Sequence, residues 1–382
     1  MKTEKLYYKD AYIKEFKATV LSCEHSNGGY DIILDKTAFF PEEGGQTSDK
    51  GLIDGKEVFD VREKDGVIHH YCKEAHEVGM EVFATINFDE RFEKMQCHTA
   101  EHIISGLFHS MYGIENTGFH LGALDVTMDT SEVVTREMMA EVERIANQAV
   151  FDNVKIETIF PTKEELPTLS YRSKLDITDN VRIVNIGKYD SCACCAPHVN
   201  FTGEIGFIKF IDSVKHKSGS RIRILAGIRA YDYISRMAKE ASGISVMLSA
   251  PVLEISEEVK RVLDSRDALE YKISELGKSM AELIAESLEY TEGNRVLYYP
   301  SLDLESLRTL ANKAFDKTGG ILLLLTGEER AYKYILTSSA PDFQKVVKDA
   351  NSILNGKGGG RAPMATGTYG TSLEDIKKYF CV

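Results

Sequence analysis

Two pairs of metal-ligand side chains, far apart in the sequence, place the strongest constraint on how this chain folds. His98 and His102 stand four residues apart in a segment of helical period, so both imidazoles lie on one helix face about one turn apart. Cys194 and His198, also four residues apart, follow a predicted strand. Two helical histidines with a cysteine and a further histidine form a ligand set that zinc favours. The pattern therefore predicts one tetrahedral zinc site per chain and a fold that brings the two segments together.

The residues alone leave three other interpretations of this cluster open. His98-x-x-Glu101-His102 is also the inverted zinc-peptidase motif, in which the glutamate is a general base, but that motif leaves the Cys/His pair unexplained. Cys192-x-x-Cys195 has the spacing of a redox pair, although no thioredoxin-like βαβ pattern surrounds it. A purely structural zinc site, closed by four protein ligands, is the third.

The first two-thirds of the chain divides into two predicted units. Up to about residue 90, short β-rich runs alternate with turn signals such as Asn-Gly-Gly and Lys-Asp-Gly, which predicts a small β-barrel over residues 1–90. Beyond Asp89 the apolar period becomes helical, from Met95 to Met111, and Gly113 follows as a stop signal. A two-layer α+β domain is predicted over residues 91–245. Its further elements are a helix at 131–151 capped by Thr130 or Ser131, and strands at 126–128, 156–160, 181–186, 206–211 and 221–227.

The remaining residues predict a helical spacer and a C-terminal unit. From Val252 to Tyr290 the apolar residues keep a seven-residue repeat, which Arg266 and Ser287 interrupt in one phase. This predicts a coiled coil or long helical hairpin over 250–291, with an amphipathic helix packed on its own domain as the alternative. Residues 292–382 predict an α/β unit, with helices at 304–317, 343–354 and 373–380, strands at 321–325 and 333–337, and a glycine-rich loop from 356 to 361.

Composition excludes several classes of protein. The net charge of -13 argues against broad adhesion to nucleic acid or to an anionic membrane. The longest apolar stretches, such as Ile321 to Leu325, are far shorter than a membrane span, and the N-terminus has no secretory or transit pattern. The 7 cysteines are odd in number, and three of them crowd into four positions, which suits metal chemistry better than a disulfide framework. We therefore expect a soluble, cytoplasmic protein with reduced thiols.

One segment has the opposite charge from the whole. Between Lys209 and Lys239 there are eight basic residues and two acidic ones. Such a segment indicates a partner rich in phosphate. The alternative is an edge strand and a helix whose basic side chains serve only solubility.

Motifs of a known family occur in order along nearly the whole chain. Thr37-Ala-Phe-Phe-Pro-Glu-Glu-Gly-Gly-Gln46 is similar to the glycine-rich loop of that family's N-terminal barrel, and the two ligand pairs are similar to the halves of its zinc site. The other matching stretches are Gly118 to Gly122 with Val126 to Asp129, Thr202 to Lys209, Gly219 to Ile224, and Gly358 to Gly367, the last close to the signature of the DHH-associated C-terminal domain. The chain resembles the alanyl-tRNA editing proteins of the long AlaX type, which look like the editing and C-terminal parts of alanyl-tRNA synthetase.

The resemblance implies an editing domain of the threonyl/alanyl-tRNA synthetase type and a trans-editing hydrolase. Its substrates would be mischarged tRNA(Ala), chiefly seryl-tRNA(Ala) and in addition glycyl-tRNA(Ala). A hydrolytic second sieve is needed because a pocket sized for alanine cannot strongly reject such side chains. The zinc, which we expect to orient the substrate rather than to activate water, would be held by His98, His102, Cys194 and His198. Gln46, His120 and Thr127 are the candidates for contact with substrate or water. A zinc-stabilised tRNA-binding module without hydrolytic activity is the alternative.

The resemblance also implies partners. Lys215, Lys217, Arg221 and Arg223 would bind phosphates of the tRNA(Ala) acceptor end, and Gly358, Gly359, Gly360 and Arg361 would approach RNA at its outer corner. A homodimer through the coiled coil or the C-terminal domain is a further expected partner, and no membrane is expected.

Two differences from the synthetase pattern stand out. The synthetase motif reads Cys-Gly-Gly-Thr-His where this chain has Cys194-Cys-Ala-Pro-His198, so Cys195 or Cys192 competes with Cys194 as the ligand. Because Met1 lies shortly before Gln46, we expect no class II aminoacylation segment and no tRNA charging by that route.

Overall fold

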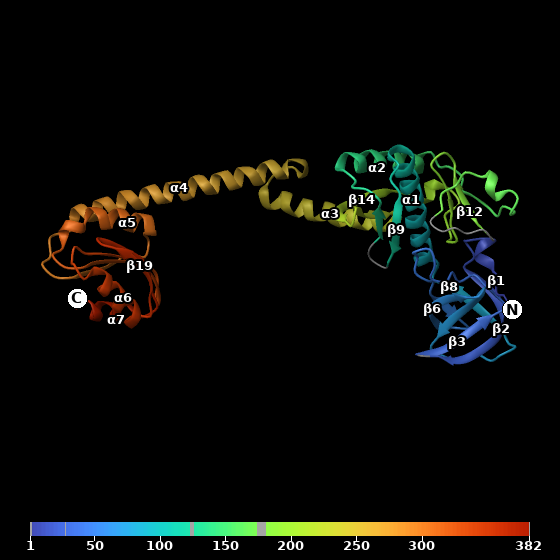
Figure 1. The fold of residues 1–382 in the computed structure, drawn as a ribbon, viewed down its shortest axis with the longest axis horizontal. Helices are drawn as coiled ribbons and strands as arrows, with labels where there is room; N and C mark the ends of the chain where they lie inside the picture. The colour runs from blue at the N-terminus through green and yellow to red at the C-terminus, as the bar shows by residue number, and fades with distance from the viewer. Residues whose placement is uncertain (1, 27, 123–125, 174–180, 382) are drawn as a thin grey trace. The chain divides into compact units, whose positions relative to one another are not determined.

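The computed structural model describes residues 2–26, 28–122, 126–173 and 181–381 (Figure 1). It forms two compact units, residues 1–240 and residues 241–382, each with mixed α and β structure. Among the described residues, no helix combines the length and the apolar character needed to cross a membrane.

A closed barrel begins the first unit. Its neighbouring strands pair antiparallel, and side chains alternate between a buried interior and an exposed exterior, as Phe16, Ala18 and Val20 show on the first long strand. Around the barrel the order is β2 (Glu15–Ser26), β3 (Gly29–Leu34), β7 (Val67–Cys72), β6 (Lys56–Lys64), β5 (Gly51–Ile53) and β8 (Glu81–Ile86). A short parallel pair, β1 (Glu4–Lys5) and β4 (Lys36–Thr37), lies beside it.

The glycine-rich loop after β4 leaves the barrel and meets strand β9 (Asn116–Leu121). The Leu121 amide donates to the Gly45 carbonyl at 2.8 Å. A Cβ at Gly45, whose φ is +81°, would lie 2.4 Å from the Phe119 carbonyl oxygen, so only glycine allows this crossing. The loop thereby places its residues beside strand β9.

Helix α1 (Phe88–Tyr112) follows the barrel directly. Asn87 caps it by accepting from the Glu90 amide, and it ends at Gly113 in the left-handed conformation, which confirms the predicted stop signal. Between Met95 and Phe108 every side chain is buried. Around α1 lie a sheet in the order β14 (Ile208–His216), β15 (Gly219–Ala226), β10 (Val126–Thr130), β9, and a smaller sheet in the order β11 (Glu157–Ile159), β12 (Ile183–Ile186), β13 (Asp190–Ala193) (Figure 1).

Helix α2 (Arg136–Phe151) begins later than predicted. Its cap is Thr135, which accepts from the Met138 amide at 3.3 Å, rather than Thr130 or Ser131. Thr130 instead donates to the Glu132 and Ser220 carbonyls, so it joins β10 to β15. The helix packs on α1 and on β14.

The second unit begins within helix α3 (Gly227–Leu248) and contains the long helix α4 (Ile255–Ser287). Its sheet has helices on both faces: Leu322 and Leu324 pack toward α4 and α5 (Leu304–Lys313), whereas Leu323 and Leu325 pack toward α6 (Phe343–Ile353) and α7 (Leu373–Tyr379). Burial on both faces explains the unbroken apolar run of this strand. The sheet order is β16 (Arg295–Tyr298), β17 (Leu322–Glu328), β18 (Ala331–Thr337), β20 (Met364–Tyr369) and β19 (Lys357–Arg361).

The glycine-rich segment of this unit is a strand, which corrects the predicted loop. β19, with Gly358, Gly359, Gly360 and Arg361, pairs antiparallel with β20 at the edge of the sheet. A Cβ at Gly358 would lie 2.4 Å from the Thr366 carbonyl oxygen, so the glycine serves close approach of two strands rather than a turn.

A buried ion pair joins the barrel to α1. The Arg91 guanidinium donates to Asp49 from Nε at 2.9 Å and to the Ala38 carbonyl from Nη2 at 2.7 Å, and the side chains of Arg91 and Asp49 are 0% and 1% exposed. Next to it, Lys94 Nζ donates to the Ser48 carbonyl at 2.7 Å. These bonds hold α1 against the barrel.

Replacing Arg91 with alanine should lower the free energy of unfolding of this unit by about 3–5 kcal/mol, because Asp49 would remain as a buried, unpaired charge. The matched control, Lys17→Ala, breaks the exposed Lys17–Glu81 pair and should cost less than about 1 kcal/mol. Urea unfolding followed by circular dichroism measures both. Equal stability of the two variants would show that the pair does not hold the barrel on α1.

Candidate metal centre

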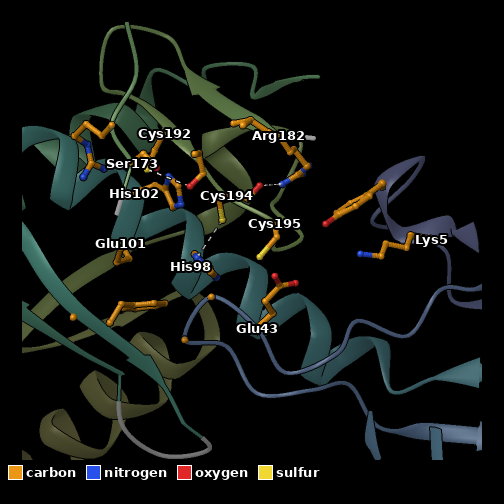
Figure 2. Close-up of a pocket in the computed structure, with 18 residues that line it drawn as sticks. Lys5, Glu43, His98, Glu101, His102, Ser173, Arg182, Cys192, Cys194 and Cys195 are labelled. Carbon is orange, nitrogen blue, oxygen red and sulfur yellow. Dashed lines mark hydrogen bonds between the residues drawn. The ribbon is translucent and has the colours of Figure 1, made fainter. Parts of the chain in front are cut away.

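The two ligand pairs predicted from the sequence meet in the first unit. His98 and His102 project from α1, and Cys194 lies in the segment after β13 (Figure 2). His198 follows in the same segment. Their ligand atoms all lie within 4.8 Å of one another. Cys194 Sγ is 3.6 Å from His98 Nε2 and 3.4 Å from His198 Nε2. Three imidazoles and one thiol at this spacing could hold a metal ion.

Each imidazole of the cluster is held through its Nδ1 atom. Gln46 Oε1 lies 2.9 Å from Nδ1 of His98, and Asp190 Oδ2 lies 3.0 Å from Nδ1 of His102. Thr99 Oγ1 lies 3.0 Å from Nδ1 of His198, and its own proton is donated to the Met95 carbonyl at 2.7 Å. Because each partner offers an acceptor, the proton is assigned to Nδ1 and the Nε2 lone pair faces the cluster. The cluster therefore fits a metal such as zinc.

The charges in the cluster favour a thiolate at Cys194. Burial opposes this charge, but the imidazoles of His98, His198 and His102 outweigh it and lower the pKa of the Cys194 thiol well below 9.0. Burial likewise opposes a charge on His102, but the Cys194 sulfur and Asp190 raise the pKa of His102 well above 6.5. Burial lowers the pKa of His198 to about 3. These directions favour a negative charge on the Cys194 sulfur, which is the form in which cysteine binds a metal ion.

The neighbouring cysteines have different surroundings. Burial, the Cys194 sulfur and the Glu43 carboxylate raise the pKa of Cys195, which hydrogen-bonds Glu43. Burial also raises the pKa of Cys192, which lies on β13 and forms a second group of possible ligands with His102 and Asp190. Among the described residues, Cys194 is the one cysteine whose sulfur forms a possible metal-binding group with all three histidines.

Asp190 is a functional residue that sequence reasoning missed. Its buried carboxylate lies between His102 and the Arg172 guanidinium, which donates to it at 2.8 and 2.9 Å. Burial would raise the pKa of Asp190, but bonds to His102 and Arg172 lower it instead. A single aspartate at the start of a strand has no sequence signature, so only the fold identifies it.

A cavity of about 500 Å³ lies against the cluster. His98, His102 and Cys194 line one part of it, and Phe119 of β9 lines another. On the side of the barrel the lining includes Glu43 and Lys5 (Figure 2). Tyr8 also belongs to the lining. A volume of this size is typical of sites for small ligands or the end of a larger one.

None of the three predicted substrate-contacting residues lines this cavity. Gln46 is fully buried behind His98 rather than in the cavity lining. His120 and Thr127 are direct cross-strand partners on β9 and β10, and neither lines the cavity. Because strand side chains alternate, His120 and Thr127 lie on the opposite face of the sheet from Phe119.

Half of the predicted basic segment is paired with carboxylates: among its eight basic residues, these are Lys209, Arg221, Arg223 and Arg229. Arg221 donates to Asp129 at 2.6 and 2.7 Å, and Arg223 donates to Asp212. Lys215 and Lys217 are exposed near the turn between β14 and β15. Of the four predicted phosphate-binding side chains in this segment, two therefore already have acidic partners on neighbouring strands.

Two family models match the chain. The model described as the threonyl and alanyl tRNA synthetase second additional domain matches residues 181–224, which include Cys194 and His198. The model described as tRNA synthetases class II (A) matches residues 2–90, which include the barrel and the loop with Gln46.

Curated relatives match over much greater lengths. Alanyl-tRNA editing protein AlaX-L from Pyrococcus horikoshii is 27% identical over 392 residues, covering 98% of this chain and 96% of that protein. Alanyl-tRNA editing protein Aarsd1 from Mus musculus is 26% identical, covering 93% and 92%. Alanine–tRNA ligase from Methanococcus vannielii is 30% identical over 99% of this chain, which spans only 43% of that ligase. The chain is thus a homologue, over nearly its full length, of the alanyl-tRNA editing proteins AlaX-L and Aarsd1.

Proposed function

We propose that this protein is a trans-editing hydrolase that deacylates mischarged tRNA(Ala), chiefly seryl-tRNA(Ala) and also glycyl-tRNA(Ala), at a zinc-containing site. The observation that carries the proposal is the placement of the buried His/Cys cluster in the wall of a cavity of about 500 Å³. The alternative, a zinc-stabilised tRNA-binding module without hydrolytic activity, needs the cluster but gives no reason for the cavity beside it.

The proposed reaction is ester hydrolysis at the terminal ribose, in which water attacks the aminoacyl carbonyl and the ribose oxygen leaves with a proton. His98, His102, Cys194 and His198 would hold the zinc, which when bound supplies a fixed positive charge that orients a polar group of the aminoacyl ester. The protein groups around it hold the geometry: Asp190 and Gln46 fix two of the imidazoles, and the Phe119 ring lies 5.0 Å from the His98 ring and limits access of bulk water.

We place the tRNA on the surfaces with exposed cations. Lys215 and Lys217 would contact phosphates near the acceptor end, and the exposed strand β19 with Arg361 would contact the outer corner. Affinity for tRNA would then fall with rising salt concentration.

A homodimer is the second partner that we propose, and the apolar stripe on α4 supports it. Leu269, Ile273, Leu276, Met280 and Leu283 follow the seven-residue repeat, and each is between 48% and 67% exposed. Ala281 and Ala285, on another face of the helix, are buried in the cluster that includes α5. In an antiparallel pair with Ile273 facing Leu276 of the second copy, Arg266 would face Leu283, one helical turn from Glu286. A parallel pair would instead bring the two Arg266 side chains together.

Replacing Cys194 with serine should remove the bound zinc and lower deacylation of seryl-tRNA(Ala) at least about 100-fold, because the thiolate ligand is lost. Metal analysis of the purified protein and a deacylation assay measure the two effects. The exposed Cys381, in the other unit, provides the control variant Cys381→Ser, which should behave as wild type. Retained zinc in Cys194→Ser with lost zinc in Cys192→Ser would assign the ligand to Cys192. Binding of tRNA and zinc by the wild-type protein without deacylation would establish the binding module instead.

Asp190→Asn should weaken zinc affinity about 10–100-fold, because the amide no longer holds the His102 imidazole with a negative charge. Competition with a chromophoric chelator measures this affinity without any assay of activity. The control, Asp212→Asn, removes an exposed carboxylate bonded to Arg223 and should leave zinc affinity unchanged. Equal affinities of Asp190→Asn and wild type would remove Asp190 from the metal centre.

Leu276→Glu should convert the dimer to a monomer, because it places a charge at the centre of the apolar stripe. Sedimentation velocity of the full chain measures the change. The control Tyr271→Glu substitutes an equally exposed residue outside the stripe and should stay dimeric. A monomeric wild-type protein at micromolar concentration would disprove the dimer.

A further inference from the structure

Glu43 presents a carboxylate to the cavity from the glycine-rich loop. Figure 2 shows its side chain directed toward Cys195, beside the metal cluster. The loop runs close to the cluster: a Cβ at Gly44 would be in van der Waals contact with Cys195 Sγ at 3.4 Å and with His98 Cε1 at 4.0 Å. The carboxylate therefore faces a part of the cavity that borders the metal ligands.

The cationic side chains that line this cavity are already bonded elsewhere. Lys5 Nζ lies 2.7 Å from Glu63, and Arg172 donates to Asp190. Arg182 Nη1 donates to the carbonyls of Cys194 and Ala196, at 2.9 and 2.8 Å. In the part of the chain that the structure describes, the hydrogen-bond partner of the Glu43 side chain is the Cys195 thiol, which carries no positive charge.

The second acidic residue of the cavity is engaged differently. Glu101 accepts hydrogen bonds from the Ser105 hydroxyl and the Asn116 amide on one carboxylate oxygen, and it is 4% exposed. Glu43 is exposed, and its hydrogen-bond partner among the described residues is the Cys195 thiol rather than a hydroxyl or an amide. Of the two carboxylates, it is the one with capacity for a cation brought in by a ligand.

We propose that Glu43 binds the α-ammonium group of the aminoacyl ester, and that the site thereby selects aminoacyl-tRNA with an unblocked amine. The inference rests on the proposed function, which supplies the substrate class. An aminoacyl ester carries one cation, its amine, which is one carbon away from the scissile carbonyl. With the carbonyl beside the metal ligands, the amine would therefore lie close to a carboxylate that borders those ligands. A charge-assisted hydrogen bond at a partly exposed mouth contributes modestly to affinity but strongly to orientation.

An acylated amine has no charge and is bulkier, so it would lose this contact. N-acylaminoacyl-tRNA and peptidyl-tRNA would therefore bind and react poorly. This selection is a property of the loop and is separate from the choice between serine and alanine side chains.

The test is a binding cycle that needs no hydrolysis. Two stable adenosine amides are compared on the zinc-loaded, full-length protein: 3′-(serylamino)-3′-deoxyadenosine and its counterpart in which hydrogen replaces the amine. Isothermal titration should show that wild type prefers the amine-bearing compound about tenfold. Glu43→Gln, which keeps the size of the side chain, should reduce the preference to about one. Glu42→Gln is the matched control, because Glu42 is the adjacent residue and pairs with Arg62.

The outcomes separate this inference from the proposed function. Equal binding of the two amides by wild type, or a preference that persists in Glu43→Gln, would overturn the role of Glu43. Loss of zinc from Glu43→Gln would overturn it too, by showing that the residue supports the cluster. Seryl-tRNA(Ala) that resists the wild-type protein would count against the hydrolase, whereas the tenfold preference would still assign Glu43 to the amine.

Discussion

The near-complete burial of α1 is the constraint on which the rest of this unit depends. Polar side chains within a buried helix must each find a partner, because an unpaired buried polar group is costly. Arg91 and Lys94 find theirs in the barrel, at Asp49 and the Ser48 carbonyl. His98 and His102 find theirs in the glycine-rich loop and on β13, at Gln46 and Asp190. One helix thus specifies how the barrel, the loop and the small sheet assemble around it.

The candidate metal centre is a consequence of the same assembly. Because the Nδ1 partners come from three different segments, the cluster takes shape only when the loop, α1 and the segment after β13 are all in place. Binding of a metal would then stabilise the folded unit over the unfolded chain, in which these ligands are far apart. The cavity arises at the same junction, since the barrel loop, α1 and β9 all contribute to its wall. The stability of this unit and the geometry of the candidate site therefore depend on the same contacts.

Sequence reasoning identified the elements whose signal is local. The four-residue spacing of His98 and His102 and the stop at Gly113 describe α1 well, because both depend only on helix geometry. Strand β6 has a weaker local signal, because the register shift between Val58 and Asp60 breaks the alternation of apolar residues. β19 was read as a loop because its glycines serve strand contact rather than a turn. The residues that hold the ligands, such as Asp190, meet them only in the folded chain, so no local sequence pattern identifies them.

The charge of a surface is also poorly predicted from local sequence. A count along residues 209–239 indicated a basic surface, but Asp129 of β10 and Glu143 of α2, both far away in sequence, pair with Arg221 and Lys209. A net charge along a segment therefore does not measure the charge that a partner meets. The converse holds for Glu43, which is unremarkable in an acidic chain, yet the fold places it in a cavity whose cations are bonded to other groups. What a charged side chain can bind depends on which of its neighbours are already paired, and only the folded structure determines that.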